Sequence, residues 1–189
     1  MLKATVSGSF HRHMPAVYTA VADLRAAGVD VLSPSDPRVV DYIGEFLFVA
    51  SDKLRSIKLV QDRHFEAIRA SDFLWIVCPD GYTGASTSAE IGAAYMSRTP
   101  VFSTHLPVDI TIQQYVRKVP SIQAAVQMMQ APHNRQPEST RHFLLDPDVT
   151  IEECMKTLER LRPVMNGKSK EQTEQEVKLA RETLLRSFR

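Results

Sequence analysis

The sequence is poor in the features that mark several large functional classes. It has two cysteines in 189 residues, 7% aromatic residues and a formal net charge of only +1. Cys78 lies in an apolar run and Cys154 in a later helical pattern, and their spacing fits buried reduced thiols better than a metal site or a disulfide. A net charge so close to zero gives no general attraction to nucleic acid or to a membrane surface. We therefore expect no metal, no cofactor and no nucleic acid polymer as a partner.

Long apolar runs are missing as well. No apolar stretch approaches the roughly 20 residues that a membrane-spanning helix needs. The first residues, 1–6, form a short strand-like run rather than a charged segment followed by a long apolar one. These features predict a cytoplasmic protein with no membrane partner. The length suits one well-buried domain with an appendage.

What the chain does contain is an alternation of short apolar runs and helical patterns. Strands are expected at 2–7, 29–32, 73–78 and 100–103, and helices at 16–27, in a long stretch ending near residue 70, at 87–97 and at 121–129. This order predicts an α/β fold, a Rossmann-like or flavodoxin-like doubly wound parallel sheet. Ligands of such sheets bind beyond the carboxyl ends of the strands, so the loops 8–13 and 79–86 are the expected binding region.

The composition changes after residue 129. We expect an α/β domain at 1–129, a linker at 130–149 rich in Pro, His, Asn, Gln and Ser, and a helical extension at 150–189. The extension contains two capping-box patterns, at 150–153 and 169–172, which are typical of helix starts. Its narrow apolar stripes could pack on the domain, on each other or on a second subunit.

The segment 70–95 carries the strongest functional pattern. An apolar strand is followed by a loop with Gly81 and Gly84, and then by a helix whose start offers the hydroxyls of Ser86 and Ser88. We expect Glu90 in the first helical turn, where the helix dipole favours an ionised carboxylate. Such a carboxylate can act as a nucleophile. A plainer interpretation is that residues 87–90 are a capping box and Glu90 only closes the helix.

Four pieces of the sequence carry a resemblance to a known family. They are Ser7-Gly8-Ser9-Phe10, the segment 28–34, Ala67-Ile68 with Ser71-Asp72, and Gly81-Tyr82 continued by Ala89-Glu90-Ile91-Gly92-Ala93-Ala94. In this order the chain resembles the nucleoside 2-deoxyribosyltransferase family and its nucleotide N-glycosidase relatives, over about residues 2–129.

The resemblance implies a reaction and its main residue. Glu90 matches the family's nucleophilic glutamate, which attacks C1′ of the sugar, expels the base and forms a glycosyl-enzyme that water or a second base resolves. Where the family usually has an aspartate that positions or protonates the base, this chain has His64, which can also donate a proton near neutral pH. Asp62 is the alternative, and it is also possible that neither residue acts, His64 then being an ordinary helix residue.

The candidate ligand-binding residues come from the two loops. Arg12 would add charge for a 5′-phosphate, Asp80 would make polar contacts and Tyr82 would stack or hydrogen-bond. Phe10 belongs to the first loop but is expected to pack, as is Trp75, which is left out of the site because it is mid-strand. The complete set is Gly8, Ser9, Phe10, Arg12, Asp80, Gly81, Tyr82, Gly84, Ser86 and Ser88.

The sequence leaves several functions open. One is an enzyme that hydrolyses nucleosides or nucleoside monophosphates or exchanges their bases, with a nucleoside or nucleotide as its small-molecule partner. Another is a non-catalytic nucleotide sensor or assembly module that uses the segment after residue 130. A phosphoribohydrolase of the cytokinin-activating type ranks last because its Pro-Gly-Gly-x-Gly-Thr pattern is absent. The family resemblance further implies a homo-oligomer, since relatives complete their sites across a subunit interface.

Overall fold

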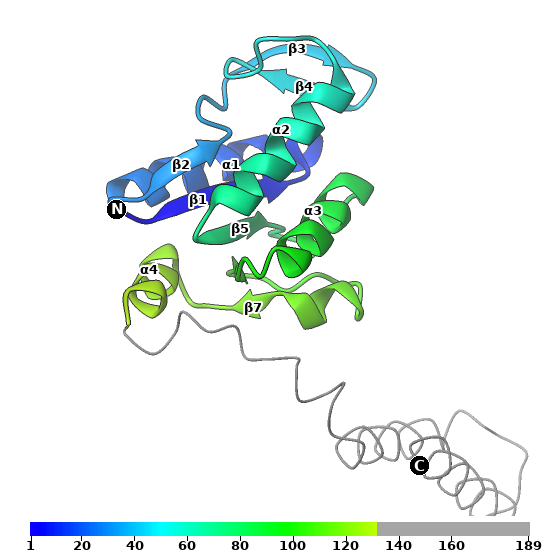
Figure 1. Ribbon diagram of the computed structural model, residues 1–189. Helices are drawn as coiled ribbons and strands as arrows, with labels where there is room; N and C mark the ends of the chain where they lie inside the picture. Colours follow the sequence, from blue (N-terminus) through cyan, green and yellow to red (C-terminus); the bar gives the residue numbers. More distant parts are fainter. Residues whose placement is uncertain (132–189) are drawn as a thin grey trace, which may run out of the picture. The chain divides into compact units, whose positions relative to one another are not determined.

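The computed structural model describes residues 1–131 (Figure 1). The expected helical extension at 150–189, Cys154 and nearly all of the expected linker lie outside the described residues. None of the helices in the described part is long and apolar enough to cross a membrane.

The core of the described region is a five-stranded parallel sheet. Its strands are β1 (Lys3–Gly8), β2 (Asp30–Ser33), β5 (Phe73–Val77), β6 (Val101–Ser103) and β7 (Arg117–Lys118). They lie in the order β2-β1-β5-β6-β7, and every neighbouring pair is parallel. Counting the sheet strands along the chain, this is the order 2-1-3-4-5 of flavodoxin-like folds. The α/β fold prediction is confirmed.

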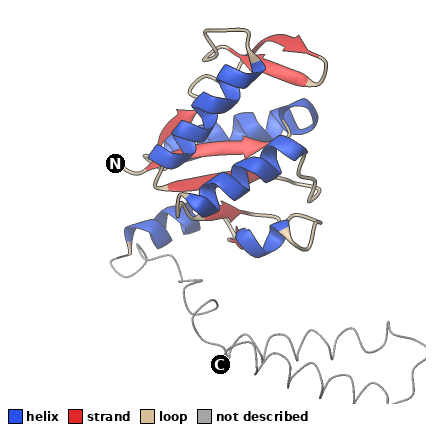
Figure 2. Ribbon diagram, turned by 45° about the vertical axis from the view of Figure 1, so that its right-hand side comes forward, coloured by secondary structure: helices blue, strands red, loops and turns tan. Residues whose placement is uncertain are grey.

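Helices cover both faces of this sheet (Figure 2). One face packs against α1 (Phe10–Ala26) and α4 (Ile122–Gln130), and the other against α2 (Ile57–Ala70) and α3 (Ala85–Met96). The starts of α2 and α4 follow from capping, since the Ser56 and Ser121 hydroxyls accept amide protons of their first turns. A short 3-10 helix, η1 (Ile112–Tyr115), precedes β7.

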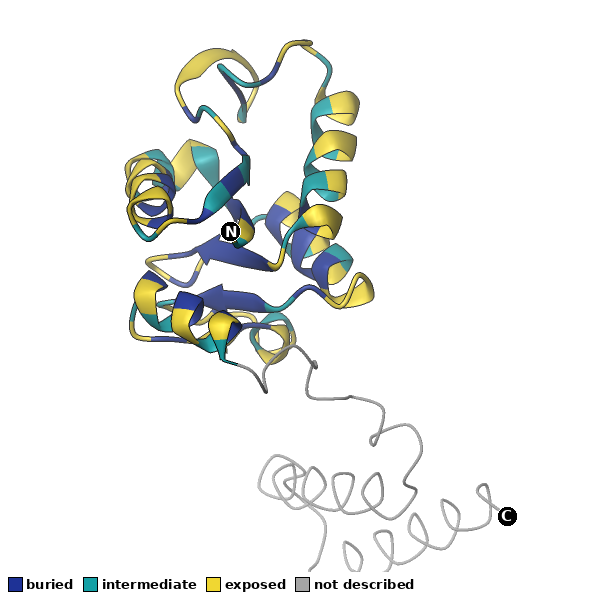
Figure 3. Ribbon diagram, turned by 60° about the vertical axis from the view of Figure 1, so that its left-hand side comes forward, coloured by how far each residue is buried: buried dark blue, intermediate teal, exposed yellow. Residues whose placement is uncertain are grey.

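The central strand β5 shows why the sheet needs two covers. All five of its residues are buried, in line with the dark blue strands in the centre of Figure 3. Its side chains alternate between the two hydrophobic cores, Trp75 packing on the α1 side and Ile76 on the α2 side. Trp75 is therefore a packing residue, as expected. Cys78, the residue that follows β5, is a buried free thiol, and burial raises its pKa.

One expectation about the stretch before residue 70 is wrong. Instead of one long helical stretch, the chain forms an antiparallel hairpin of β3 (Val39–Ile43) and β4 (Phe46–Val49) before α2 begins. The hairpin lies beyond the amino-terminal end of α2 (Figure 1). Its strands are rich in β-branched and aromatic residues, and Gly44, with φ of 59°, makes the turn. These local preferences outweigh the helical pattern of the longer stretch.

The start of α1 also differs from the expectation. Residues 10–13 were expected in a loop, but they form the first turn of a helix that is kinked at His13, where φ is −124° and ψ is 24°. Pro15 lies just after the kink. Because proline lacks an amide proton and its ring crowds the carbonyl group of the preceding turn, Pro15 accounts for a break in this turn of the helix. The first loop is therefore reduced to Ser9, between β1 and α1.

Candidate functional site

Five polar side chains from four elements meet where the carboxyl ends of β1 and β2 face α2 and α3. We call them the Glu90 cluster: Ser7, Ser33, Gln61, His64 and Glu90. Ser7 belongs to β1 and Ser33 ends β2, while Gln61 and His64 are three residues apart on one face of α2. Since β1 and β2 are neighbours in the sheet, their ends bring the two serines to the same histidine.

Glu90 occupies the buried face of α3. The helix begins at Ala85 after the N-cap Gly84, so Glu90 lies in its second turn. The sequence had placed Glu90 in the first turn, and this expectation is wrong. Thr87 is buried inside the helix, and the helix start carries no side-chain cap bond. The capping-box interpretation of residues 87–90 is therefore wrong. Glu90 points inward because its spacing matches that of Thr87, Ile91 and Ala94, the other buried residues of this face.

The carboxylate of Glu90 has few partners for a buried acid. It is 6% exposed, its Oε1 accepts a hydrogen bond from Gln61 Nε2 at 2.8 Å, and its Oε2 lies 3.7 Å from Nε2 of His64. Within residues 1–131 no lysine or arginine forms an ion pair with it. Burying a carboxylate without a strong cationic partner is costly, and such arrangements concentrate at functional sites.

His64 is held at both ring nitrogens. Its Nδ1 lies 2.8 Å from Ser33 Oγ and its Nε2 lies 3.0 Å from Ser7 Oγ. Burial lowers the pKa of His64, and the nearby Glu90 carboxylate opposes this only in part. The ring is therefore neutral at neutral pH. It can donate a hydrogen bond from one nitrogen, but it holds no additional proton of an imidazolium to deliver.

Asp62, the alternative to His64, lies away from the Glu90 cluster. Two residues along an α-helix correspond to a rotation of about 200°, so Asp62 and His64 project from nearly opposite faces of α2. Asp62 is exposed and forms an ion pair with Lys58. Of the two residues, the structure brings only His64 to Glu90.

A second group of side chains joins α1 to the loop after β5. We call it the loop cluster: Arg12, His13, Asp80 and Tyr82. His13 Nε2 lies 3.2 Å from Asp80 Oδ1, and the guanidinium of Arg12 lies 4.0 Å from the centre of the Tyr82 ring. The Tyr82 amide and then His13 hold the pKa of Asp80 below its usual range. The two loops that the sequence indicated therefore do come together.

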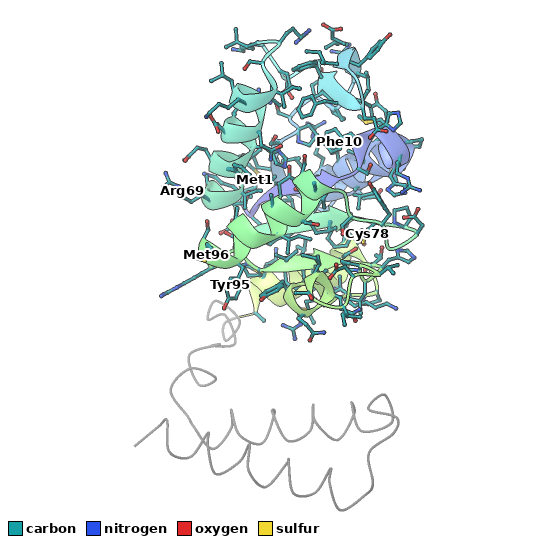
Figure 4. All side chains as sticks on the ribbon, turned by 90° about the vertical axis from the view of Figure 1, so that its right-hand side faces the viewer. Met1, Phe10, Arg69, Cys78, Tyr95 and Met96 are labelled. Carbon is teal, nitrogen blue, oxygen red and sulfur yellow. The ribbon has the colours of Figure 1, made fainter. Side chains whose placement is uncertain are left out.

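The other candidate ligand residues lie around these two clusters. Gly81 has a φ of +76°, and its carbonyl accepts the Val108 amide at 2.8 Å, so it shapes the loop. Phe10 packs against the core on the α1 side, as expected (Figure 4 labels it at the start of α1). Ser9 is the N-cap of α1, Gly84 is the N-cap of α3, and Ser86 and Ser88 lie in the first turn of α3.

Gly8 lets the two central strands approach each other at this edge. It pairs with Val77 across the β1–β5 ladder, and a Cβ atom at this position would lie only 2.6 Å from the Val77 carbonyl oxygen. The close approach that Gly8 permits is therefore to β5, within the chain itself.

Sequence reasoning missed four residues of the two clusters: Ser7, Ser33, Gln61 and His13. A signal existed for three of them. Ser7 and Ser33 are hydroxyl residues at the carboxyl ends of expected strands, and Gln61 precedes His64 by three residues, which places both on one helix face. His13 lay within the expected binding loop 8–13, but nothing in the sequence indicated its pairing with Asp80, which depends on the kink in α1.

The Glu90 cluster contains two possible nucleophiles. Ser7 Oγ lies within hydrogen-bond distance of an imidazole nitrogen, as a serine activated by a base would. Ser7, however, is fully buried, and the group at the other ring nitrogen is the Ser33 hydroxyl and not a carboxylate. Glu90 retains some exposure and is a nucleophile without prior deprotonation by a base. The arrangement therefore favours Glu90.

A groove of about 400 Å³ lies elsewhere, on the face covered by α1 and α4. Asp23, Trp75, His105 and Gln123 are among its lining residues. It includes no member of the Glu90 cluster or of the loop cluster, so it is separate from the candidate site.

Compared with known proteins, the chain matches no family model, no curated protein and no solved structure. The functional interpretation therefore depends on the geometry of the two clusters and on the sequence motifs that led to them.

Proposed function

We propose that the chain binds a nucleoside or a nucleoside 5′-monophosphate and cleaves its N-glycosidic bond, with Glu90 as the nucleophile. The observation that carries the proposal is the buried Glu90 carboxylate. Its neighbours are the Gln61 amide and the neutral His64 imidazole, and no lysine or arginine of residues 1–131 forms an ion pair with it. It lies at the carboxyl edge of a flavodoxin-like sheet, where such folds bind ligands. The sequence resemblance to the nucleoside 2-deoxyribosyltransferase family supports the same reaction.

The reaction proceeds in two displacements. In the first, a carboxylate oxygen of Glu90 forms a bond to C1′ of the sugar, and the C1′–N bond breaks with its electron pair going to the base. The base takes up a proton from solvent. In the second, the oxygen of a water molecule bonds to C1′, the ester bond to Glu90 breaks, the carboxylate is regenerated and the water loses a proton to solvent. If a second base replaces water, the same intermediate gives base exchange.

Two residues of α2 assist Glu90 in this scheme. The Gln61 amide, bound to Oε1 at 2.8 Å, fixes the carboxylate and leaves Oε2 for attack. His64 is neutral and acts as a hydrogen-bond donor toward the charge that develops on the departing base. In this role the histidine does not need to transfer a proton.

The loop cluster is the proposed binding surface for the remainder of the substrate. Tyr82 offers a 39% exposed aromatic ring, and Arg12 adds a guanidinium beside it. A guanidinium and the free amides at the start of α3 favour a phosphate. We also propose that the chain is a homo-oligomer, because members of the family that it resembles complete their sites across a subunit interface.

The substitution Glu90→Gln tests the nucleophile. The amide keeps the shape of the side chain but is a far weaker nucleophile, so base release should fall at least about a thousand-fold while the substrate still binds. The assay follows base release by chromatography from a panel of nucleosides and monophosphates, with and without a second free base. Glu66→Gln, on the exposed surface of α2, is the matched control and should leave the rate unchanged. A slow 2-fluoro sugar substrate should leave an adduct on Glu90 that mass spectrometry detects.

The same panel separates the alternatives. Base exchange that exceeds hydrolysis when a free base is present would indicate a transferase. Saturable binding of a nucleotide with no base release by the wild-type protein would favour the sensor. Wild-type rates in Glu90→Gln would remove the nucleophile assignment.

A further inference from the structure

The neutral ring of His64 carries a single proton, and the groups around the ring decide which nitrogen holds it. A neutral imidazole has one N–H donor and one acceptor nitrogen, and the hydrogen bond made by one nitrogen decides the state of the other. Here Nδ1 faces only the Ser33 hydroxyl among the hydrogen-bond partners in residues 1–131, at 2.8 Å. Nε2 faces Ser7 Oγ at 3.0 Å and Glu90 Oε2 at 3.7 Å.

The charge of Glu90 distinguishes the two arrangements. With the proton on Nε2, the positive end of the N–H dipole points toward the carboxylate. With the proton on Nδ1, the lone pair of Nε2 would face the carboxylate at 3.7 Å, which is repulsive in a site so shielded from water. A serine hydroxyl can act either as donor or as acceptor, so Ser33 and Ser7 adapt to either arrangement.

We propose that Ser33 is a positioning residue that donates its hydroxyl proton to Nδ1 of His64, so that the ring's proton is held on Nε2, toward Ser7 and Glu90. Ser33 is buried at the end of β2, and this strand is fixed beside β1, so the hydroxyl reaches Nδ1 from a rigid element. The lowered pKa of His64 agrees with a neutral ring at neutral pH.

This arrangement gives His64 a specific role, which rests on the proposed function. The Nε2–H group is the donor that would face a leaving base positioned for attack by Glu90. Ser33 does not contact the substrate. It would act through the ring, by fixing both the tautomer and the orientation of the imidazole.

The test is nitrogen NMR of the full chain with its histidines labelled with ¹⁵N. Protonated and unprotonated ring nitrogens have well separated chemical shifts, and the chain has six histidines. The His64 signals are identified by their loss in His64→Gln. In the wild-type protein at neutral pH we expect the proton on Nε2 and none on Nδ1. A proton on Nδ1, equal populations of both forms or an imidazolium would overturn the proposal.

Two serine variants test the role of Ser33. In Ser33→Ala the Nδ1 signal should move toward the value of a nitrogen without a hydrogen bond, and Ser33→Thr, which keeps the hydroxyl, should restore it. In the matched variant Ser7→Ala, the Nδ1 signal should stay at its wild-type position because the Ser33 bond remains. Equal movement in both alanine variants would show a general packing effect and would overturn the assignment of Ser33.

Kinetics supply the readout for positioning. Ser33→Ala should lower kcat for base release about tenfold or more with little change in KM, since the substrate does not touch Ser33. An unchanged kcat with an altered Nδ1 signal would overturn the role in the reaction. The NMR result needs no substrate, so a protein that shows the expected tautomer but releases no base would refute the proposed function and leave the tautomer assignment intact.

Discussion

At the scale of single residues, the notable feature is a carboxylate and an imidazole that share a buried space without a full counter-charge. Glu90 and His64 are both nearly buried, and burial lowers the pKa of the histidine although an acid lies 3.7 Å from it. The desolvation of the imidazolium thus outweighs the attraction to Glu90. The imidazole is therefore neutral at neutral pH, which is the state in which the proposed reaction uses it.

The lowered pKa of His64 predicts how stability depends on pH. The unfolded chain binds a proton at this residue near its ordinary pKa of 6.5, but the folded chain does so only at lower pH. The stability linked to His64 is therefore complete above about pH 6.5 and is lost as the pH falls toward the lowered pKa. The maximum slope for one proton is about 1.4 kcal/mol per pH unit.

The measurement for this prediction is urea unfolding of the wild-type protein and of His64→Gln over a range of pH. The slope below pH 6.5 should be smaller in the variant, while His11→Gln, at an exposed position, should keep the wild-type slope. Identical slopes in wild type and His64→Gln would contradict the prediction.

At the scale of elements, helix α2 connects the hairpin to the Glu90 cluster. On one side, Arg63 pairs with the buried carboxylate of Asp52, which also accepts the Val49 amide at 2.8 Å. On another side, Gln61 and His64 reach Glu90. The position of the hairpin and the position of the site residues therefore depend on the same two turns of one helix.

The pairing of the buried Asp52 carboxylate with the partly exposed Arg63 should contribute measurably to stability. We expect Asp52→Asn to lower the free energy of unfolding by about 1.5–3 kcal/mol, because the variant removes a charge-assisted hydrogen bond from a buried position. Asp36→Asn, which weakens a solvent-exposed pair with Arg38, should lower the free energy of unfolding far less. Chemical denaturation of both variants measures the difference, and equal losses would show that Asp52 does not have the assigned role.

The tight contact at Gly8 leads to a second prediction about stability. In Gly8→Ala the added methyl group would meet the Val77 carbonyl oxygen at 2.6 Å, so β1 and β5 must move apart at the site, at a cost of about 1–3 kcal/mol. Gly92→Ala is the matched control, because its Cβ would enter open space on the outside of α3. There the alanine should stabilise the helix by about 0.5–1 kcal/mol. The signs of the two changes in thermal unfolding should therefore be opposite.

The elements also show what the sequence could predict. The strands β1 and β5 and the helix with Glu90 were expected within two residues of their observed positions because their apolar patterns are local. The hairpin was missed although its β-branched and aromatic residues and Gly44 are a local signal, because the helical pattern of α2 was extended back over them. The start of α1 was missed because Pro15 resembles the first residue of a helix, whereas the helix here begins earlier and bends.

The candidate site was predictable only in part, because several of its contacts depend on how strands far apart in the sequence are arranged. Loop positions and the resemblance indicated Glu90, His64, Arg12 and Tyr82. The contacts of Ser7 and Ser33 with His64 require that β2 lie beside β1, and alternation of strands and helices does not specify that order.

At the scale of the whole molecule, the described residues contain two hydrophobic cores, one on each face of the sheet. Every member of the two cores lies between residues 2 and 129. Contacts within the chain separate a compact unit, Met1–Pro137, from the remainder. The stability of the α/β fold should therefore reside in this unit, since core burial supplies most of the stabilising free energy.

Removal of residues 138–189 tests this division. We expect the shortened chain to unfold cooperatively in urea at a midpoint close to that of the full chain, because it keeps all the core residues of the described part of the chain. Base release by monomers would also be retained if one chain sufficed for the site.

The sequence, however, predicts that the segment from about residue 150 contributes to subunit contacts, so the shortened chain should have fewer subunits in light scattering. If the site is shared between subunits, as proposed, base release should fall together with the subunit number while the unfolding midpoint stays. A lower subunit number with full activity would place the complete site within one chain, and an unchanged subunit number would contradict the assembly role of the segment.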